Sequence, residues 1–287
     1  MEKKYILFIF FFFFLVAIAV SVALYKSQEL KRTYKAQVLQ GLDNIKKSQR
    51  AVITEEDIKH LPQPVQKYLR YVGVMGKEKV ESVRVVCEGE FRPDPKKDWA
   101  KMESVQYNFF TEPARIYYIG LKMSGIPVVG LHSYRDAKAT MLIKLAGLFT
   151  VANGRGPIMN SAETVTVFND MCLLVPATLI DKRIQWETID SSTVKATFVN
   201  KDNKISALLY FNDKGELINF ISDDRYYSPT GDTYLKARWS TPVGDYKVIN
   251  GLRLPTYGEA IWQFPEGDYC YAKLKIKDVE YNPQSFR

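Results

Sequence analysis

The chain has 287 residues, of which 46% are hydrophobic and 25% charged, proportions that exclude a disordered or low-complexity protein. Its formal net charge is +8, but residues 26–50 alone hold seven Lys/Arg against two Asp/Glu. A nucleic-acid-binding domain needs its basic residues on the folded part of the chain. Because the excess charge is gathered in one short segment instead, we expect no nucleic-acid partner.

The first apolar run extends from Tyr5 to Tyr25 without a charged residue. A helix of about 20 apolar residues spans a hydrocarbon core of roughly 30 Å, so residues 1–25 are predicted to be an N-terminal transmembrane anchor. The alternative is a cleaved signal sequence, whose apolar region is shorter, about 7–15 residues. We expect a single-pass protein of the cell membrane. The side of the following domain stays open, because the basic residues after Tyr25 favour the cytoplasm while a short basic tail favours export.

Residues 26–53 have helical composition and are predicted to form a basic juxtamembrane helix or a loose stalk. Lys and Arg beside a bilayer gain about 1 kcal/mol each from anionic headgroups, which makes the lipid bilayer the expected partner of this segment. An ordinary solvated helix face is the alternative.

A compact helical unit follows. Thr54 is placed to cap a helix whose first turn is acidic, and Gly73 is placed to end a second one. Between them, apolar residues recur at helical spacing at Val65, Tyr68, Leu69 and Val72. This pattern predicts a short amphipathic helix that packs on the rest of the domain.

From Val80 onward the apolar period changes to two, which is typical of half-buried strands. Asn250-Gly251 is the dipeptide most typical of a tight hairpin. Residues 54–287 are therefore predicted to be a single antiparallel β-rich domain. The expected fold is mainly β (α+β), a large curved antiparallel sheet or half-barrel with a few short helices. The strands are expected at 83–91, 105–109, 114–121, 126–130, 132–134, 194–198, 205–211, 216–222, 233–239, 246–249, 252–262 and 270–276.

Three stretches interrupt this pattern. Ala139–Phe149 is almost wholly apolar but too short to cross a bilayer, so it is a buried strand, a lid or a membrane-dipping segment. Asn153–Pro157 is expected to be a loop, and Ser161–Met171 a helix capped by Ser161.

The sequence contains little that indicates catalysis. His60 and His132 have no companion at metal-ligand spacing. Cys87, Cys172 and Cys270 form no CxxC pair and are expected in the core. We therefore predict no catalytic residue, no metal and no cofactor.

Acidic side chains are the remaining candidates for catalysis. Asp223 and Asp224 are expected to pair locally with Arg225, and a buried Glu259 would need a partner such as Arg225 or Arg238. An enzyme acting on lipid or envelope material through these carboxylates is the third of our hypotheses.

Aromatic residues on the predicted strands are the positive signal. Most aromatics of this kind fill a core, but a curved sheet with few covering helices can leave an apolar concavity that binds a lipophilic ligand. The candidate ligand-binding residues are Tyr107, Phe109, Tyr118, Arg225, Trp239, Tyr257, Glu259 and Trp262. The first hypothesis is thus a membrane-anchored protein that binds a lipid or other apolar ligand. The second is a tethered scaffold that binds a membrane protein partner.

An ordered set of motifs carries a family resemblance over residues 54–282. Among them are LPQPVQKYLRYVG (61–73), MLIKLAGL (141–148), NGLRLPT (250–256), EAIW (259–262) and the closing EYN (280–282). The chain resembles an uncharacterised bacterial family, a domain of unknown function behind one N-terminal membrane helix. That resemblance implies no catalytic residues. The layout is also similar to the lipoprotein-carrier (LolA/LolB-like) half-barrels, at the level of fold alone.

Overall fold

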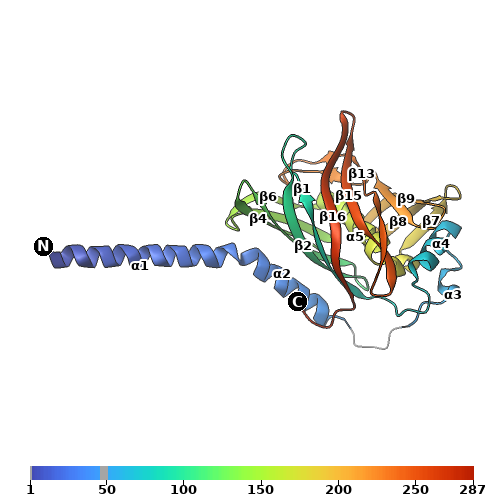
Figure 1. Ribbon diagram of the computed structural model, residues 1–287, viewed down its shortest axis with the longest axis horizontal. Coiled ribbons are helices and arrows are strands. Elements are labelled where there is room, and N and C mark those ends of the chain that lie inside the picture. The colour runs from blue at the N-terminus through green and yellow to red at the C-terminus, as the bar shows by residue number, and fades with distance from the viewer. Residues whose placement is uncertain (1, 46–50) are drawn as a thin grey trace.

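The computed structural model describes residues 2–45 and 51–287. Residue 1 of the predicted anchor and residues 46–50 of the predicted stalk lie outside the described residues. The chain begins with the long helix α1 (Glu2–Ser27), which points away from the rest of the molecule (Figure 1). A bend at Gln28 separates it from α2 (Glu29–Asp43), where the Arg32 guanidinium lies 3.9 Å from the Tyr25 ring and donates to the Tyr25 carbonyl.

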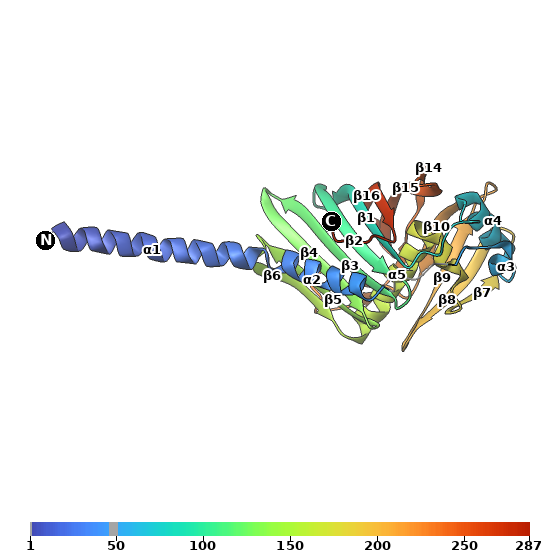
Figure 2. The ribbon, with the colours of Figure 1, turned by 90° about the horizontal axis from the view of Figure 1, so that it is seen from below.

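Helix α2 packs along the outer face of the sheet rather than forming a loose stalk. Its Leu30, Tyr34 and Val38 are buried at helical spacing against β3 (Ala114–Met123) and β4 (Ile126–Arg135), as Figure 2 shows. The basic residues of α2 are left on its other side, which is why the segment looked like a solvated helix in sequence.

The helical unit after residue 53 has the expected ends. Helix α3 (Glu55–Ile58) begins at Thr54 with a capping box closed by Asp57, whose carboxylate accepts from the Thr54 backbone N–H at 2.9 Å. Helix α4 (Gln63–Val72) ends at Gly73, which has φ 87° and thus the left-handed conformation that glycine adopts without strain.

Among the described residues, fourteen strands form one antiparallel sheet in the order β6-β5-β4-β3-β2-β1-β16-β15-β13-β10-β9-β8-β7, with β14 paired to β15. The sheet curls strongly but its ends do not join, so it is a half-barrel, as predicted (Figures 1 and 2). The other strands are β1 (Ser82–Phe91), β2 (Ala100–Phe109), β5 (Lys138–Leu145), β6 (Phe149–Arg155), β7 (Ile184–Thr188), β8 (Thr193–Asn200), β9 (Asn203–Phe211), β10 (Leu217–Ser222), β13 (Arg238–Ser240), β14 (Val243–Ile249), β15 (Leu252–Phe264) and β16 (Gly267–Tyr281). Two short strands, β11 (Tyr226–Tyr227) and β12 (Leu235–Lys236), pair separately.

Helix α5 (Pro157–Leu174) runs inside the curve of the sheet and is buried along most of its length. The 3₁₀ helix η1 (Pro176–Ile180) follows it. The main core lies between α5, α4 and the concave face, and includes the stacked rings of Phe168 and Phe198. A second, smaller core lies between α2 and the outer face.

Four local predictions were wrong. Helix α5 begins at Pro157, not at Ser161, because proline suits the first helical turn. Residues 153–155 continue strand β6 instead of forming a loop, and residues 126–135 form one strand where two were expected. Cys270 lies on the outer face, because a bulge in the β15–β16 pairing shifts it relative to Ala272.

Candidate functional site

The concave face of β5, β4, β3, β2, β1 and β16 is ordered into rows of side chains that lie opposite one another across the strands. Two of these rows, which we call the covered rows, pass beneath α5: Met141-His132-Tyr117-Gln106-Val85-Val279 and Ala139-Tyr134-Arg115-Asn108-Val83-Tyr281. The other two, which we call the open rows, lie nearer the β3–β4 and β5–β6 hairpins. They are Leu145-Val128-Leu121-Met102-Gly89-Leu274 and Ile143-Gly130-Ile119-Ser104-Cys87-Ile276.

The covered rows are tied to α5 through Asp170, which is buried. One carboxylate oxygen of Asp170 accepts from Gln106 at 2.9 Å, from Asn108 at 2.8 Å and from Nε of Arg115 at 2.8 Å. A buried ion pair of this kind is held by its hydrogen bonds, since the removal of either partner leaves an uncompensated charge. Asp170 therefore fixes the C-terminal half of α5 against β2 and β3.

Glu163, two turns earlier on α5, is the centre of a second charged group. Its carboxylate lies 3.5 Å from Nη1 of Arg115, 3.3 Å from Nη1 of Arg225 and 3.9 Å from Nδ1 of His132. Burial alone would raise the pKa of Glu163, but the interaction with His132 and the charges of Arg225 and Arg115 outweigh it. They hold that pKa well below its ordinary value.

Arg225 reaches α5 from the segment after β10. Its Nη1 donates to the Ala162 carbonyl at 3.0 Å and to the Thr166 hydroxyl. The guanidinium lies over the ring of Trp239 at 4.5 Å and of Trp262 at 5.6 Å, distances typical of cation–π contacts. The charged groups under α5 thus have partners within the protein, and their chemistry is that of a structural network.

The open rows are apolar, in contrast to the charged groups of the covered rows and α5. They contain no charged residue, and Ser104 is their single polar side chain. Ile119, Leu121, Leu145 and Leu274 are only partly buried, although they lie on the inside of the curve. The hydrogen bonds that α5 makes to these six strands in the described structure all fall in the covered rows or at their level, so α5 is attached over that half of the concave face. Within the open rows, Met102, Ser104 and Val128 are buried, and Cys87, Ile143 and Ile276 pack against the main core.

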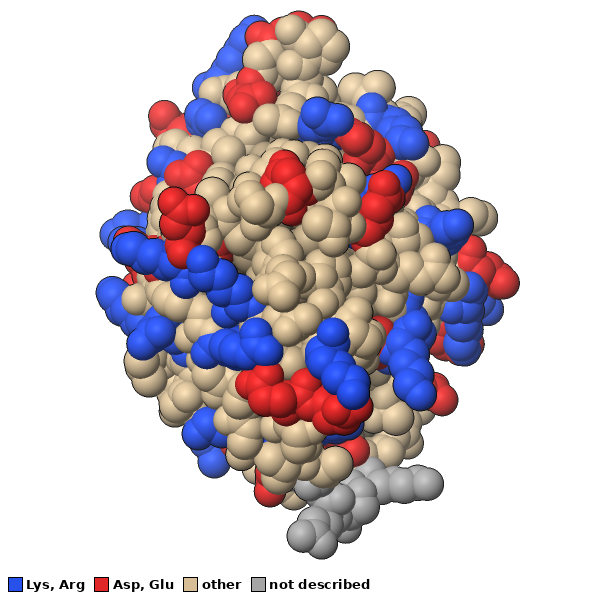
Figure 3. Space-filling view, turned by 90° about the vertical axis from the view of Figure 1, so that its right-hand side faces the viewer, with Lys and Arg blue, Asp and Glu red and all other residues tan. Residues whose placement is uncertain are grey.

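Neither of two hollows in the described part of the chain is lined by residues of the open rows. One of about 670 Å³ lies along the side chains of α1 and one of about 310 Å³ lies beside α4, lined by Gln63, Pro64, Lys67, Arg70 and Ser191. The end of the molecule opposite α1, which Figure 3 shows, carries Lys/Arg and Asp/Glu side chains interspersed without a continuous basic stripe.

The eight predicted ligand-binding residues are divided among three places. Tyr107, Phe109 and Tyr118 lie on the outer face beneath α2, where the Tyr34 ring is 5.5 Å from that of Tyr118. Arg225, Trp239 and Trp262 lie together on the concave side beside α5.

Tyr257 and Glu259 lie on the outer face, where the Tyr257 hydroxyl donates to Glu259 at 2.6 Å. The structure does not bring the eight together. Sequence reasoning missed the open rows, because Leu121 and Leu145 are ordinary aliphatic residues until the register aligns them.

The acidic residues considered for catalysis are also dispersed. Asp223 pairs with Arg238 at 2.8 Å, and Asp224 accepts from the Ser206 backbone N–H at 2.8 Å. The expected local pairing of these carboxylates with Arg225 was wrong, because Arg225 turns inward to Glu163. Glu259 has Tyr257 as its partner instead of an arginine. Within residues 2–45 and 51–287, no group of three His, Cys, Asp or Glu side chains is placed to hold a metal ion.

Residues 51–274 match the model of the Family of unknown function (DUF6544). The chain belongs to this family. The resemblance inferred from the sequence motifs is thereby confirmed, and it brings no activity with it. No curated protein matches the chain.

Two solved structures share the general layout. A Vibrio parahaemolyticus domain assigned to outer membrane lipoprotein sorting has 9% identity and a TM-score of 0.41, and the match covers 76% of this chain and 90% of that one. A LolA superfamily protein from Nitrosomonas europaea has 12% identity and a TM-score of 0.38, over 75% of this chain and 92% of that one. At these values the two structures say nothing about what this chain binds.

Proposed function

We infer that this protein is anchored in a membrane by α1 and binds a lipid or another apolar ligand on the open rows of its half-barrel. The observation that carries the proposal is the partial exposure of Ile119, Leu121, Leu145 and Leu274 inside a concave face. Water-exposed apolar surface is unfavourable by about 25 cal/mol per Å². Leu145, Leu121 and Leu274 lie in the first open row, with the buried Val128 and Met102 between them, and Ile119 lies beside Leu121 in the second. Exposed apolar side chains gathered on a concave surface are typical of an apolar binding site.

The anchor rests on the length and exposure of α1. The structure has one helix long and apolar enough to cross a membrane among the described residues, and its apolar window is not buried inside the protein. Tyr5 and Tyr25 lie at the two ends of the uncharged run in α1, an arrangement typical of aromatic residues at the two interfaces of a bilayer. A signal sequence passes the same tests of length and composition, so the anchor is part of the proposal.

The position of α5 on the concave face limits where a ligand can bind. Helix α5 and its paired charges occupy the covered rows, so a ligand is expected to lie only against the open rows and to contact the protein through apolar side chains. The cluster of Arg225, Trp239 and Trp262 is expected to act as the inner wall of this space. The other predicted ligand-binding residues, on the outer face, are expected to stabilise the fold.

A scaffold that binds a membrane protein partner is the second candidate function. The observation that favours it is the exposed edge strand β6, whose Phe149 and Val151 are open to solvent. Exposed strand edges are templates for pairing with another chain.

The test of ligand binding is native mass spectrometry of the full chain, released from nanodiscs of bacterial lipid. We expect retained lipid on the wild-type chain and on Ile218→Gln, a control at an exposed aliphatic residue of β10. We expect the lipid to be lost in Leu121→Gln combined with Leu145→Gln. Equal retention in the double variant and the control would overturn the proposal, as would a wild-type chain that carries no lipid.

A further inference from the structure

The hairpin between β5 and β6 lies directly against the end of α1. Gly147, at the tip of this hairpin, has φ 70°, and a methyl group built on it would overlap the backbone of Ser27, the last residue of α1. Two residues after Ser27, Glu29 of α2 pairs with Lys144 of β5 at 2.6 Å. The hairpin is therefore held at the level where the apolar helix ends and the folded domain begins.

The same hairpin presents apolar side chains to its surroundings. Phe149 is 67% exposed and Val151 is 49% exposed, both on the edge strand β6. The neighbouring β3–β4 hairpin joins this one through a hydrogen bond from the Ala146 N–H to the Pro127 carbonyl at 2.7 Å, and its Ile126 is 44% exposed. Exposed apolar residues are thus gathered at the hairpin ends nearest α1.

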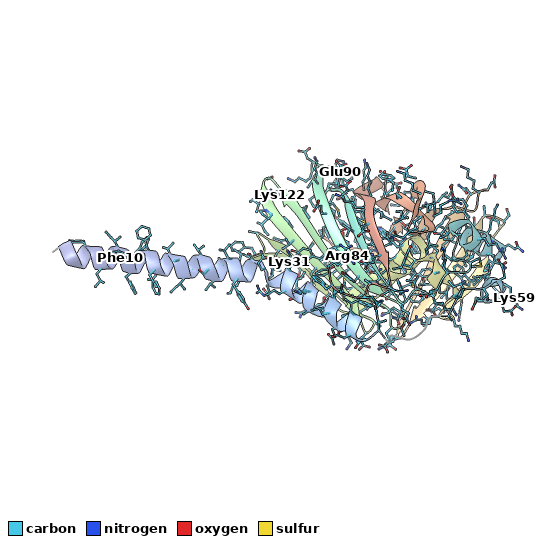
Figure 4. The ribbon with its side chains drawn as sticks, turned by 60° about the horizontal axis from the view of Figure 1, so that its bottom comes forward. Phe10, Lys31, Lys59, Arg84, Glu90 and Lys122 are labelled. Carbon is cyan, nitrogen blue, oxygen red and sulfur yellow. The ribbon has the colours of Figure 1, made fainter. Side chains whose placement is uncertain are left out.

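Basic side chains surround this apolar group. Lys122 lies at the end of β3 that faces α1, and Lys31 lies on α2, as Figure 4 shows. Lys26 ends the apolar helix itself. Apolar side chains flanked by Lys and Arg are typical of protein surfaces that rest in the headgroup region of a bilayer, where the lysine stems lie along the apolar layer and their amines stay in water.

We propose that the β5–β6 hairpin, through Phe149 and Val151, inserts into the headgroup region of the same bilayer that holds α1. This second membrane contact, assisted by Ile126, fixes the half-barrel against the bilayer surface. Phe149 lies opposite Leu145 in the β5–β6 pairing and so extends the first open row to the membrane. The open rows then begin at the lipid surface. An apolar ligand can pass between the bilayer and the open rows without crossing water. The inference rests on the proposed membrane anchor but not on ligand binding.

The test uses the full chain in vesicles of phosphatidylglycerol and phosphatidylcholine, with the phosphatidylcholine either unlabelled or brominated on its acyl chains. Phe149→Trp is compared with Val248→Trp, because Val248 is 66% exposed but lies on β14, away from α1. The four native tryptophans lie outside α1 and provide the background fluorescence that is subtracted from each variant. Val151→Trp serves as an independent second probe of the hairpin.

Insertion to an interfacial depth of roughly 5–10 Å brings the ring near the acyl chains, so we expect the added fluorescence of Phe149→Trp to fall by about half in brominated vesicles. The added fluorescence of Val248→Trp should not change. Equal quenching in both variants, or none in Phe149→Trp and Val151→Trp, would overturn the proposed contact. Quenching that disappears when the protein is diluted in lipid would also overturn it, because the hairpin would then reach the bilayer only in association with another copy of the chain.

A carbonate wash of the same vesicles separates this inference from the anchor. Retention of the chain supports the anchor, and the quenching result then decides the hairpin contact alone. Release of the chain by carbonate would overturn the anchor and the hairpin contact together.

Discussion

The two halves of the concave face use their side chains in opposite ways. Charge is buried where α5 meets the covered rows: Arg115 of the covered rows pairs with Asp170 and Glu163 of α5, and Arg225 pairs with Glu163 from the segment after β10. The open rows leave Leu121 and Leu145 partly exposed at the end nearest α1. In an ordinary soluble domain charge is exposed and aliphatic side chains are buried. The buried charges thus attach α5 to the sheet, while the open rows keep several aliphatic side chains in partial contact with solvent.

The largest expected effect comes from breaking the attachment of α5. Asp170→Ala removes the nearer of the two carboxylates of buried Arg115, at 2.8 Å against 3.5 Å for Glu163, and leaves Gln106 and Asn108 without their acceptor. We expect it to lower the unfolding free energy by about 3–5 kcal/mol. The measurement is urea unfolding of the full chain in mild detergent, followed by tryptophan fluorescence. Asp223→Ala is the matched control, because its partner Arg238 is exposed and such pairs contribute about 0–1 kcal/mol. Similar losses in the two variants would contradict the structural role of the covered rows.

Acidification should lower the unfolding free energy by weakening the ion pairs of Glu163 on α5. Because the folded-state pKa of Glu163 lies below its ordinary value of 4.5, its contribution to stability is complete above pH 4.5 and declines as the pH falls toward the folded-state pKa. The unfolding free energy of the wild-type chain should therefore fall below pH 4.5. Glu163→Gln should start lower and fall less steeply over that range. Parallel pH profiles of the two chains would show that Glu163 does not carry this dependence.

The attachment of the open half to α1 can be tested at two glycines. Gly147 and Gly125 both lie at hairpin tips with positive φ, so Ala at either position is strained by about 1 kcal/mol. Only at Gly147 does the new methyl group also meet Ser27. The methyl group that alanine would add at Gly125 has no neighbouring atom within 4 Å beyond the adjacent residues of the chain. Gly147→Ala should increase backbone hydrogen exchange in residues 144–150, and Gly125→Ala should leave that exchange unchanged. Equal exchange in both variants would argue against a close α1–hairpin contact.

The smallest expected effect on stability is in the open rows themselves. Leu121→Gln should change the unfolding free energy by less than about 1 kcal/mol, because the side chain is only partly buried. The same urea titration measures it. A loss of several kcal/mol would mean that the open rows are part of the core rather than a binding surface.

Much of the local structure could be predicted from the sequence. The apolar run Tyr5–Tyr25 predicted α1 by its length alone, and Thr54, Gly73 and Asn250-Gly251 predicted a helix start, a helix end and a hairpin. Alternating residues such as Val83 and Val85 predicted the strands and the half-barrel class. These features depend on residues within a few positions of one another, so a short window of sequence contains the information.

The candidate site could not be predicted in this way. Leu121 and Leu145 join one row, on either side of Val128, through the register of three strands, and Glu163 meets Arg225 across 62 positions of sequence. Nor does any local pattern say that α5 covers one half of the concave face, or that α2 covers Tyr107 and Tyr118 from outside. The sequence alone was enough to predict the long apolar helix, the half-barrel class and the family. The tertiary structure decided which apolar side chains remain exposed, because burial depends on the elements that pack across the sheet and not on the residues beside them in the chain.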